Sequence, residues 1–258
     1  MKAWENGALA SSKWLPRLIL MMAGLPLLVG GIVLWYVETR LVTDAGQSLA
    51  TAATEIASKL DMVLRERVNS IELLSHAQVL RTQNPAEIQP ILLALQDISP
   101  EYSWVALTDA KGQVIVSTQH SLLGKDFSRD SGFPAIREGA RTAVDDAVKS
   151  PEENGIFVVT VLARVEGPAG DWRGGLIARI GLPAFEDVFA QTVMALQALW
   201  GTAVHLEYQF LNSRGDLIAD SLLREEGQHN LQQMGVPSAR SVSSGPSGFV
   251  EEWFPRRQ

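Results

Sequence analysis

The chain has 258 residues, of which 46% are hydrophobic and 20% charged, the composition of an ordinary globular protein and not of a disordered one. Three basic residues and one acidic residue precede a long uncharged run, whereas nineteen basic and twenty-eight acidic residues follow it. So acidic a main part argues against a nucleic-acid-binding protein. The absence of cysteine excludes disulfides, cysteine-ligated zinc and a thiol nucleophile, and it fits an oxidising compartment.

The uncharged run covers residues 18–37 and reads LILMMAGLPLLVGGIVLWYV. A helix of this length spans roughly 30 Å, the thickness of the hydrocarbon core of a bilayer. Trp14 precedes the run, and Trp35 and Tyr36 lie near its end, where aromatic rings anchor membrane helices at both interfaces. Because the excess of basic residues precedes the run, we predict that residues 1–17 stay in the cytoplasm and that the chain after the span is exported.

Two other interpretations of residues 18–37 are weaker. A cleaved signal peptide has a shorter apolar run followed closely by small residues, but the only such site, Ala-Thr-Ala at 50–52, is too far downstream. A buried helix of a soluble protein needs amphipathic neighbours to cover it, and neither flank offers them.

A long helix is predicted over residues 39–83, continuous with the membrane span. The segment has no proline and a single glycine, Gly46. Its apolar residues step by three and four, which indicates one helical stripe. A stripe this long is too large for one small neighbour, so we predict that part of it packs on its own domain and part on a second copy, forming a homodimer. The alternative is two shorter helices broken near Gly46.

The following elements predict an α+β fold. Asn84 and Pro85 have the composition of a helix start, and the helix should end near residue 98. Turn-forming residues separate four runs of β-type composition, and two further segments have helical composition. The predicted strands are 102–108, 113–118, 156–165 and 173–180, and the predicted helices are 133–142 and 184–199. The strands pair as two hairpins, so an antiparallel sheet with helices packed on it is the most economical fold.

The first hairpin is repeated later in the chain. The stretch 107–115, LTDAKGQVI, recurs as LNSRGDLI at 211–218, and Gly112 and Gly215 stand 103 positions apart. Both stretches read as a strand, a turn closed by a glycine and a second strand, which indicates two related modules. The second module begins near residue 203 and has fewer residues than the first needs. We therefore expect it to be incomplete at 258, with a strand starting at 249–254.

This layout resembles the double Cache, or PAS-like, extracytoplasmic sensor region of bacterial transmembrane receptors. The resemblance rests on the order of the elements and on the stretches 109–118, 123–128 and 213–221. It implies a membrane-distal module at 84–200 and an incomplete membrane-proximal module at 201–258, in the bacterial inner membrane with the bulk in the periplasm or outside the cell. In this family the distal module usually holds a small molecule, and the complete receptor ends in a histidine kinase, a cyclic-dinucleotide enzyme or a chemotaxis coil.

The resemblance also implies where the ligand lies, between the sheet and the helices and loops on one face. The residues expected there are Arg129, Phe133, Tyr102, Trp104, Asp145, Asp146 and Trp172. Amino-acid-binding members place an arginine just after the glycine loop, but here Asp130 stands nearer that position and Arg129 one place earlier. We therefore expect an anionic organic acid at Arg129 rather than an amino acid.

Neither catalysis nor a cofactor is predicted. Adjacent acidic pairs are expected to be solvated surface charge. They are Asp145-Asp146, Glu152-Glu153, Glu225-Glu226 and Glu251-Glu252. The four histidines, His76, His120, His205 and His229, lack metal-ligand spacing, and the chain has no phosphate loop or nucleophile elbow. The leading hypothesis is a small-molecule sensor in which the ligand moves the long helix. Its rival is a membrane-anchored adaptor that binds another protein.

Overall fold

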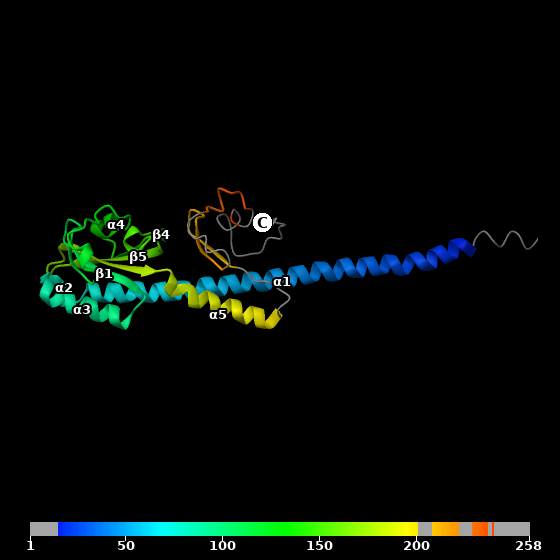
Figure 1. Ribbon diagram of the computed structural model, residues 1–258, viewed down its shortest axis with the longest axis horizontal. Helices are drawn as coiled ribbons and strands as arrows, with labels where there is room; N and C mark the ends of the chain where they lie inside the picture. Colours follow the sequence, from blue (N-terminus) through cyan, green and yellow to red (C-terminus); the bar gives the residue numbers. More distant parts are fainter. Residues whose placement is uncertain (1–14, 201–207, 222–228, 237–238, 240–258) are drawn as a thin grey trace, which may run out of the picture. The chain divides into compact units, whose positions relative to one another are not determined.

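A computed structural model describes residues 15–200, 208–221, 229–236 and 239 (Figure 1). Residues 15–51 fall in one compact unit, and the described residues from 52 onward fall in another. The helix α1, Leu15–Ser75, runs through both. From position 19 to 37 its large apolar side chains are all exposed, and by length and composition α1 could cross a membrane. An apolar helix surface with no protein cover is what lipid would solvate.

The end of α1 differs from the prediction. The long helix was expected to reach residue 83, but it ends at Ser75, and a separate short helix, α2, covers Gln78–Thr82. Between them Ala77 is extended, with φ −62° and ψ 133°, and this turn brings Leu80 into the core, where it is fully buried. The alternative break near Gly46 is also wrong, because Gly46 lies inside α1.

The next helix begins where its cap predicts. In α3, Pro85–Ile98, the side-chain oxygen of Asn84 accepts a hydrogen bond from the backbone N–H of Ala86 at 3.2 Å. Gln83 has φ 52°, and Asn84 is extended because a residue that precedes a proline, here Pro85, is kept out of the helical region. The chain therefore cannot join α2 and α3 into one helix.

Six antiparallel strands form the main sheet. They are β1 (Tyr102–Thr108), β2 (Val114–Ser117), β3 (Thr142–Val144), β4 (Val148–Lys149), β5 (Phe157–Glu166) and β6 (Trp172–Gly181). Their order is β2-β1-β6-β5-β3, with β4 paired to β5. Both predicted hairpins, β1–β2 and β5–β6, are confirmed, and the β1–β6 pairing, which sets Trp104 opposite Arg179, joins them into one sheet.

One predicted helix is too long and two strands were not predicted. The helix α4 covers Phe133–Glu138 and stops there because Gly139 has φ 121°. Thr142, expected in that helix, begins β3 instead. The two strands of this region, β3 and β4, are three and two residues long, too short to show any alternation of their own.

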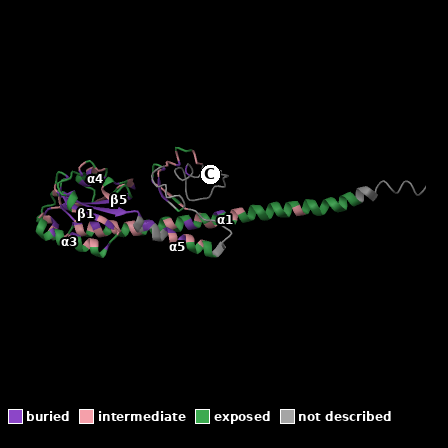
Figure 2. Ribbon diagram, viewed as in Figure 1, coloured by how far each residue is buried: buried purple, intermediate pink, exposed green. Residues whose placement is uncertain are grey.

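Helices cover both faces of the sheet (Figure 1). One face packs against α3, the end of α1 and α5, Pro183–Trp200, and this contact makes the larger core, with Leu60, Ile71 and Phe185 among its buried residues. The opposite face packs against α4 and the loops around it. Figure 2 shows β1 and β5 buried, as strands covered on both faces must be.

The second hairpin is also present. Its strands are β7 (Gln209–Leu211) and β8 (Leu217–Asp220), joined by a turn in which Gly215 has φ 81°. A small core of Leu217, Leu231 and Ala239 lies beside it. The strand expected at 249–254 lies outside the described residues.

Candidate functional site

The three predicted aromatic residues Trp104, Phe133 and Trp172 lie on the face of the sheet that α4 covers. The fourth, Tyr102, lies on the opposite face, where its hydroxyl donates to the backbone oxygen of Arg67 at 3.4 Å. A register shift in β1 between Tyr102 and Trp104 separates them. Burial raises the pKa of Tyr102 to about 12, so this phenol stays protonated.

An arginine that was not predicted lies at the centre of the α4 face. Arg179 belongs to β6, is only 8% exposed, and is flanked by the rings of Trp104 and Phe127. The guanidinium carbon is 5.1 Å from the centre of the first ring and 5.7 Å from the centre of the second. These distances allow cation–π attraction, which strengthens where water is excluded.

Three carboxylates surround the same guanidinium. Its Nη1 atom is 3.0 Å from Glu152 and 3.5 Å from Glu153, and its Nη2 atom is 3.6 Å from Asp130. Nη1 also donates to the hydroxyl of Ser150 at 2.7 Å. We call the group the Arg179 cluster: Arg179, Trp104, Phe127, Asp130, Ser150, Glu152 and Glu153.

The short loop after β4 carries two of these acids toward Arg179. Ser150 opens a single 3₁₀ turn, Pro151–Glu153, and Asn154 and Gly155, both with positive φ, close it. The backbone N–H of Gly155 returns to the oxygen of Ser150 at 2.8 Å. The turn presents both glutamates on one side, and the indole N–H of Trp104 donates to Glu153.

Asp130 reaches the cluster from a different loop, the one that follows the β1–β2 hairpin. Asp126 fixes the start of that loop, because its carboxylate accepts from the backbone N–H of Ser128 at 2.9 Å. Tight turns follow. The backbone N–H of Asp130 donates to the backbone oxygen of Phe127, and that of Phe133 donates to the backbone oxygen of Asp130, both at 3.0 Å. Two loops distant in sequence therefore meet at one arginine of the sheet.

The carboxylates of the cluster titrate differently. Burial raises the pKa of Glu152, but the hydrogen bonds from Ser150, from its own backbone N–H and from Arg179 outweigh burial and bring it to about 2. Burial raises the pKa of Asp130 above its ordinary value, and nearby Asp145 and Glu152 add to this against the opposing effect of Arg179. Lys125 also pairs with Glu152 at 3.4 Å, so the charge of Glu152 is well stabilised, whereas that of Asp130 is not.

The guanidinium also has an unused donor. The Nε atom of Arg179 is buried and has no hydrogen-bond partner among the described residues. A buried donor without an acceptor costs roughly 1–3 kcal/mol. A ligand oxygen at this point would remove that cost.

The remaining predicted site residues lie elsewhere. Arg129 is exposed, and Trp172 lies seven positions along β6 from Arg179, roughly 23 Å away in an extended strand. Phe133 and Trp172 pack edge to face, with ring centres 5.7 Å apart. Asp145 is half-buried near Asp130.

Asp146 makes a contact that was not expected. Its carboxylate accepts from the hydroxyl of Ser213 at 2.6 Å and from the backbone N–H of the same residue at 3.1 Å. Next to it, the side chain of Asn212 donates to the backbone oxygen of Ala147 at 3.3 Å. The loop between β3 and β4 therefore contacts the turn of the second hairpin.

The acidic pair Glu152-Glu153 corrects another expectation, since it was predicted to be solvated. The side chain of Glu153 is only 7% exposed, and both acids pair with Arg179. The sequence does carry one signal of this site: Arg179 interrupts the apolar run of the strand at 172–181. The pairs Glu225-Glu226 and Glu251-Glu252 lie outside the described residues. Within the described part of the chain, no group of three or more histidine or acidic side chains is placed to hold a metal ion.

No protein-family model matches this chain, and no curated protein matches it. Solved structures do match its fold. An extracellular ligand-binding receptor from Desulfohalobium retbaense is 19% identical with a TM-score of 0.62, over 75% of this chain and 34% of that one. A domain of a sensory box/GGDEF family protein from Vibrio parahaemolyticus is 13% identical with a TM-score of 0.57, over 80% of this chain and 86% of that one.

A third match is the ligand-binding domain of the Pseudomonas aeruginosa amino acid chemoreceptor PctC in complex with GABA, with 16% identity and a TM-score of 0.50 over 67% of this chain and 73% of that one. The chain spans about a third of the length of the Desulfohalobium receptor. These similarities confirm the predicted α+β fold, which is that of extracytoplasmic sensor domains.

Proposed function

We propose that this chain is the sensor region of a transmembrane receptor and that its Arg179 cluster binds a small organic molecule carrying an ammonium group. The observation that carries the proposal is the buried Arg179 between two aromatic rings and three carboxylates. The fold shared with sensor domains supports the general function, and the cluster supports the ligand class.

The charge of the cluster favours a cationic group. Three carboxylates face the guanidinium of Arg179 and the ammonium group of Lys125, which is 3.4 Å from Glu152. One negative charge is left without a cationic partner, and an ammonium group of a ligand would balance it. The rings of Trp104 and Phe127 would attract the same cation. A carboxylate on the same molecule could accept from the unpaired Nε of Arg179. PctC, the fold relative crystallised with GABA, holds a ligand with both groups.

The organic-acid prediction rested on Arg129 and stays a prediction. It is tested with the full chain in lipid nanodiscs, because ligands that bind only the folded state raise the melting temperature. We expect GABA or butylamine to raise it and butanoate or succinate to leave it unchanged. If the two acids alone raise it, the organic-acid prediction is right and the ammonium proposal fails.

The site itself is tested with a matched pair of variants. Glu153→Gln keeps the shape of the side chain and removes one of the three negative charges, so we expect at least a tenfold loss of affinity for the ammonium ligand. Glu138→Gln removes an exposed charge at the end of α4, outside the cluster, and should leave the affinity unchanged. Equal affinities in the two variants would contradict the assignment of the site.

The pH dependence of binding gives a further test, because Asp130 is the acid with the raised pKa. A proton on Asp130 removes a negative charge from the cluster, so the affinity for a cation should fall as the pH decreases through the pKa of Asp130. In Asp130→Asn that dependence should be absent.

We propose that ligand binding moves α1, as expected from the sequence. The end of α1 packs on the opposite face of the same sheet, through buried Leu60 and Ile71. A ligand can shift α1 only by binding two arrangements with different affinity. Since the chain has no cysteine, spin labels at Arg65→Cys on α1 and Lys111→Cys on the β1–β2 turn report their separation. A ligand that leaves the distance distribution unchanged would refute the movement.

We also propose that α1 crosses the bacterial inner membrane once at 18–37, with the N-terminus in the cytoplasm, and that two copies pair through α1. Exposed Leu41 and Leu49 support the pairing, since a water-exposed apolar stripe favours a partner. Protease added to spheroplasts should digest the chain beyond the span and spare an N-terminal tag. Leu49→Cys should form a disulfide between copies more readily than Arg65→Cys.

A further inference from the structure

A cavity lies beside α1, on the other side of the sheet from the Arg179 cluster. Its volume is about 510 Å³, which is within the roughly 300–1,000 Å³ typical of small-molecule sites. It is lined by Val63, Arg67, Pro100, Glu101, Ser103, Ile156, Ile180, Gly181 and Phe185. These residues come from α1, the turn before β1, the start of β1, the residue before β5, the end of β6 and α5, so one molecule in the cavity would bridge several elements.

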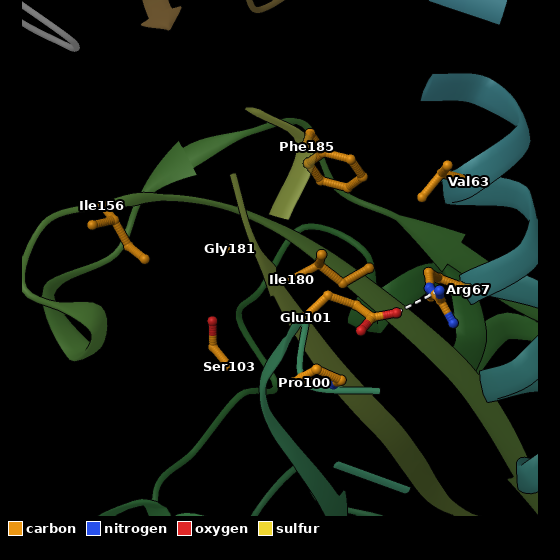
Figure 3. A pocket seen from close by; sticks show the side chains of 9 residues that line it. All are labelled: Val63, Arg67, Pro100, Glu101, Ser103, Ile156, Ile180, Gly181 and Phe185. Carbon is orange, nitrogen blue, oxygen red and sulfur yellow. Dashed lines mark ion pairs between the residues drawn. The ribbon is translucent and has the colours of Figure 1, made fainter. Parts of the chain in front are cut away.

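The cavity is mainly apolar and has polar atoms at two points. Figure 3 shows Val63 and Arg67 of α1 at one side and Ser103 and Ile156 at the other, with Ile180 between them. Apolar side chains form most of the wall. A molecule bound here would therefore gain most of its affinity from apolar burial and its orientation from a few polar contacts.

Arg67 and Glu101 form an ion pair at the α1 side, and both side chains are about four-fifths buried. The pair sets the net charge of the lining to zero, because the other lining residues are uncharged. An anionic ligand would face Glu101 and a cationic ligand would face Arg67. A neutral molecule meets neither repulsion, and it leaves the ion pair intact.

A hydrogen-bond donor remains available beside this pair. The Nε atom of Arg67 is buried and has no partner among the described residues, since only its two Nη atoms are engaged, one by Glu101 and one at 3.5 Å from Ser99. Across the cavity, Figure 3 shows the hydroxyl of Ser103 directed inward. Both groups can donate to an acceptor oxygen, and leaving Nε unpaired is costly.

We propose that this cavity is a second ligand site, for a neutral and largely apolar molecule with a carbonyl oxygen, such as an amide or an ester. The carbonyl oxygen accepts from Arg67 or Ser103, and the apolar body packs on Ile180 and Phe185. The site is separate from the Arg179 cluster. Its ligand touches α1 directly, so its affinity depends on how the end of α1 packs on the sheet.

The test uses three probes with the same five-carbon body: pentanamide, pentanoate and pentylamine. The full chain in nanodiscs carries fluorophenylalanine at its eight phenylalanines, and fluorine NMR follows each signal. Phe185 lines the cavity and Phe127 contacts Arg179, so one sample reports on both sites. Substituting each phenylalanine in turn by leucine assigns the two signals.

We expect pentanamide to shift the Phe185 signal to saturation, with a dissociation constant that is roughly millimolar for so small a molecule, and to leave Phe127 unchanged. The two charged probes should bind at least tenfold more weakly at Phe185. Ser103→Val removes the hydroxyl and fills part of the cavity, so it should weaken the pentanamide response at least tenfold. Ile156→Ala, at the partly exposed rim, should weaken it a few-fold.

A Phe127 signal that stays at its wild-type position before any probe is added shows that the variant is folded. Equal binding of pentanoate or pentylamine at Phe185 would overturn the proposed ligand class. A Phe185 signal that responds to none of the probes, or that responds equally in Ser103→Val, would overturn the site. Glu153→Gln, which keeps the shape of its side chain, should weaken the response of Phe127 to pentylamine and leave the response of Phe185 to pentanamide intact, so failure at one site is distinguished from failure at the other.

Discussion

The two glycine hairpins of this protein share one turn but differ in their surroundings. In the first, the carboxylate of Asp109 accepts from the backbone N–H groups of Lys111 and Gln113 at 2.8 and 2.9 Å. In the second, the side-chain oxygen of Asn212 accepts from those of Arg214 and Asp216 at 3.0 and 2.9 Å. Gly112 and Gly215 close the two turns with φ 92° and 81°.

The likeness extends to the segment that follows each hairpin. Phe127 donates to the oxygen of Gly112 at 2.9 Å, and Leu231 donates to that of Gly215 at 3.0 Å. Isolated bridges pair Gln113 with Asp126 and Asp216 with Asn230. In the first bridge the amide residue comes first in the chain and the acid second, and in the second bridge the order is reversed, so the backbone pairing does not depend on which side chain stands on which side.

The surroundings then diverge. β1 is seven residues long, is buried along nearly its whole length, and lies between β2 and β6 in the six-stranded sheet. β7 is three residues long, none of them fully buried, and pairs only with β8 among the described strands. The local turn therefore forms from its own residues, whereas the burial of a strand depends on partners that are distant in the chain.

The largest expected effect is at Gly174 of β6, which lies against the backbone at the end of β1. Its φ is 145°, and a Cβ atom there would lie 2.0 Å from the backbone oxygen of Thr108. Gly174→Ala should destabilise the first hairpin by more than about 4 kcal/mol. Hydrogen exchange of peptides covering residues 102–118 and 208–221 measures each hairpin separately. The second should change much less, and an equal change in both would contradict their separate stabilisation.

The turn glycines give the next effect. A Cβ at Gly112 would meet the backbone of Ser128 at 2.7 Å, and one at Gly215 would meet the Cβ of Gln232 at 2.6 Å. Both substitutions to alanine also strain a positive φ, so we expect losses of about 3 and about 2 kcal/mol. Each loss should appear in the exchange of its own hairpin. Gly124→Ala is the control, since its φ is also positive and its Cβ meets nothing within 4 Å.

For the turn residues Asp109 and Asn212, the loss of stability on substitution should be larger in the second hairpin, the reverse of the order expected for the glycines. Asn212 is only 7% exposed, and its side chain also donates to Ala147 and Asp216. Among the described residues, the carboxylate of Asp109 accepts only the two turn bonds. We expect Asn212→Ala to cost about 2 kcal/mol and Asp109→Ala about 1 kcal/mol. Asp109→Asn should be nearly neutral. Asn212→Asp keeps the turn bonds but loses both donors, and a cost below that of Asp109→Ala would contradict this account.

The smallest effect is a pH dependence of the second hairpin. Hydrogen bonds from Asn212 and Asn230 hold the pKa of Asp216 below its ordinary value. A lowered pKa contributes stability above the unfolded-state pKa, about 4, and loses it as the pH falls through the folded-state pKa. Asp216→Asn should therefore cost roughly 0.5–1 kcal/mol at neutral pH and almost nothing in strong acid. Hydrogen exchange of residues 208–221, compared between the wild type and Asp216→Asn from neutral pH to strong acid, measures whether the difference in stability falls as the pH decreases.

The features that could be predicted from the sequence are those that depend on neighbouring residues, and the features that were missed depend on residues distant in the chain. The bounds of β1, the Asn84 cap of α3 and the glycine repeat depend on neighbouring residues, and all three are confirmed. β3 and β4 were missed because two or three residues form a strand only beside β5. The break after Ser75 was missed for a related reason, since the helical periodicity continues across it.

The site was less predictable than the fold. Trp104 was expected at the site because aromatic residues of the sheet were placed there by resemblance. Glu153 and Arg179 join it from positions 26 residues apart in the sequence, and their pairing needs both the β5–β6 register and the 3₁₀ turn. From the sequence alone, the adjacent acids Glu152 and Glu153 are expected on the surface, and only the fold shows that the buried Arg179 faces them.

The loop that holds Asp146 against Ser213 is the one that leads to Glu152 and Glu153 of the Arg179 cluster. Binding energies are linked reciprocally, so a ligand that loosens or tightens this contact must find its own affinity altered by the same factor when the contact is removed. Under the proposed function, a change at Ser213, which lies outside the Arg179 cluster, would then shift the ligand concentration at which the protein responds while leaving the side chains of the cluster in place.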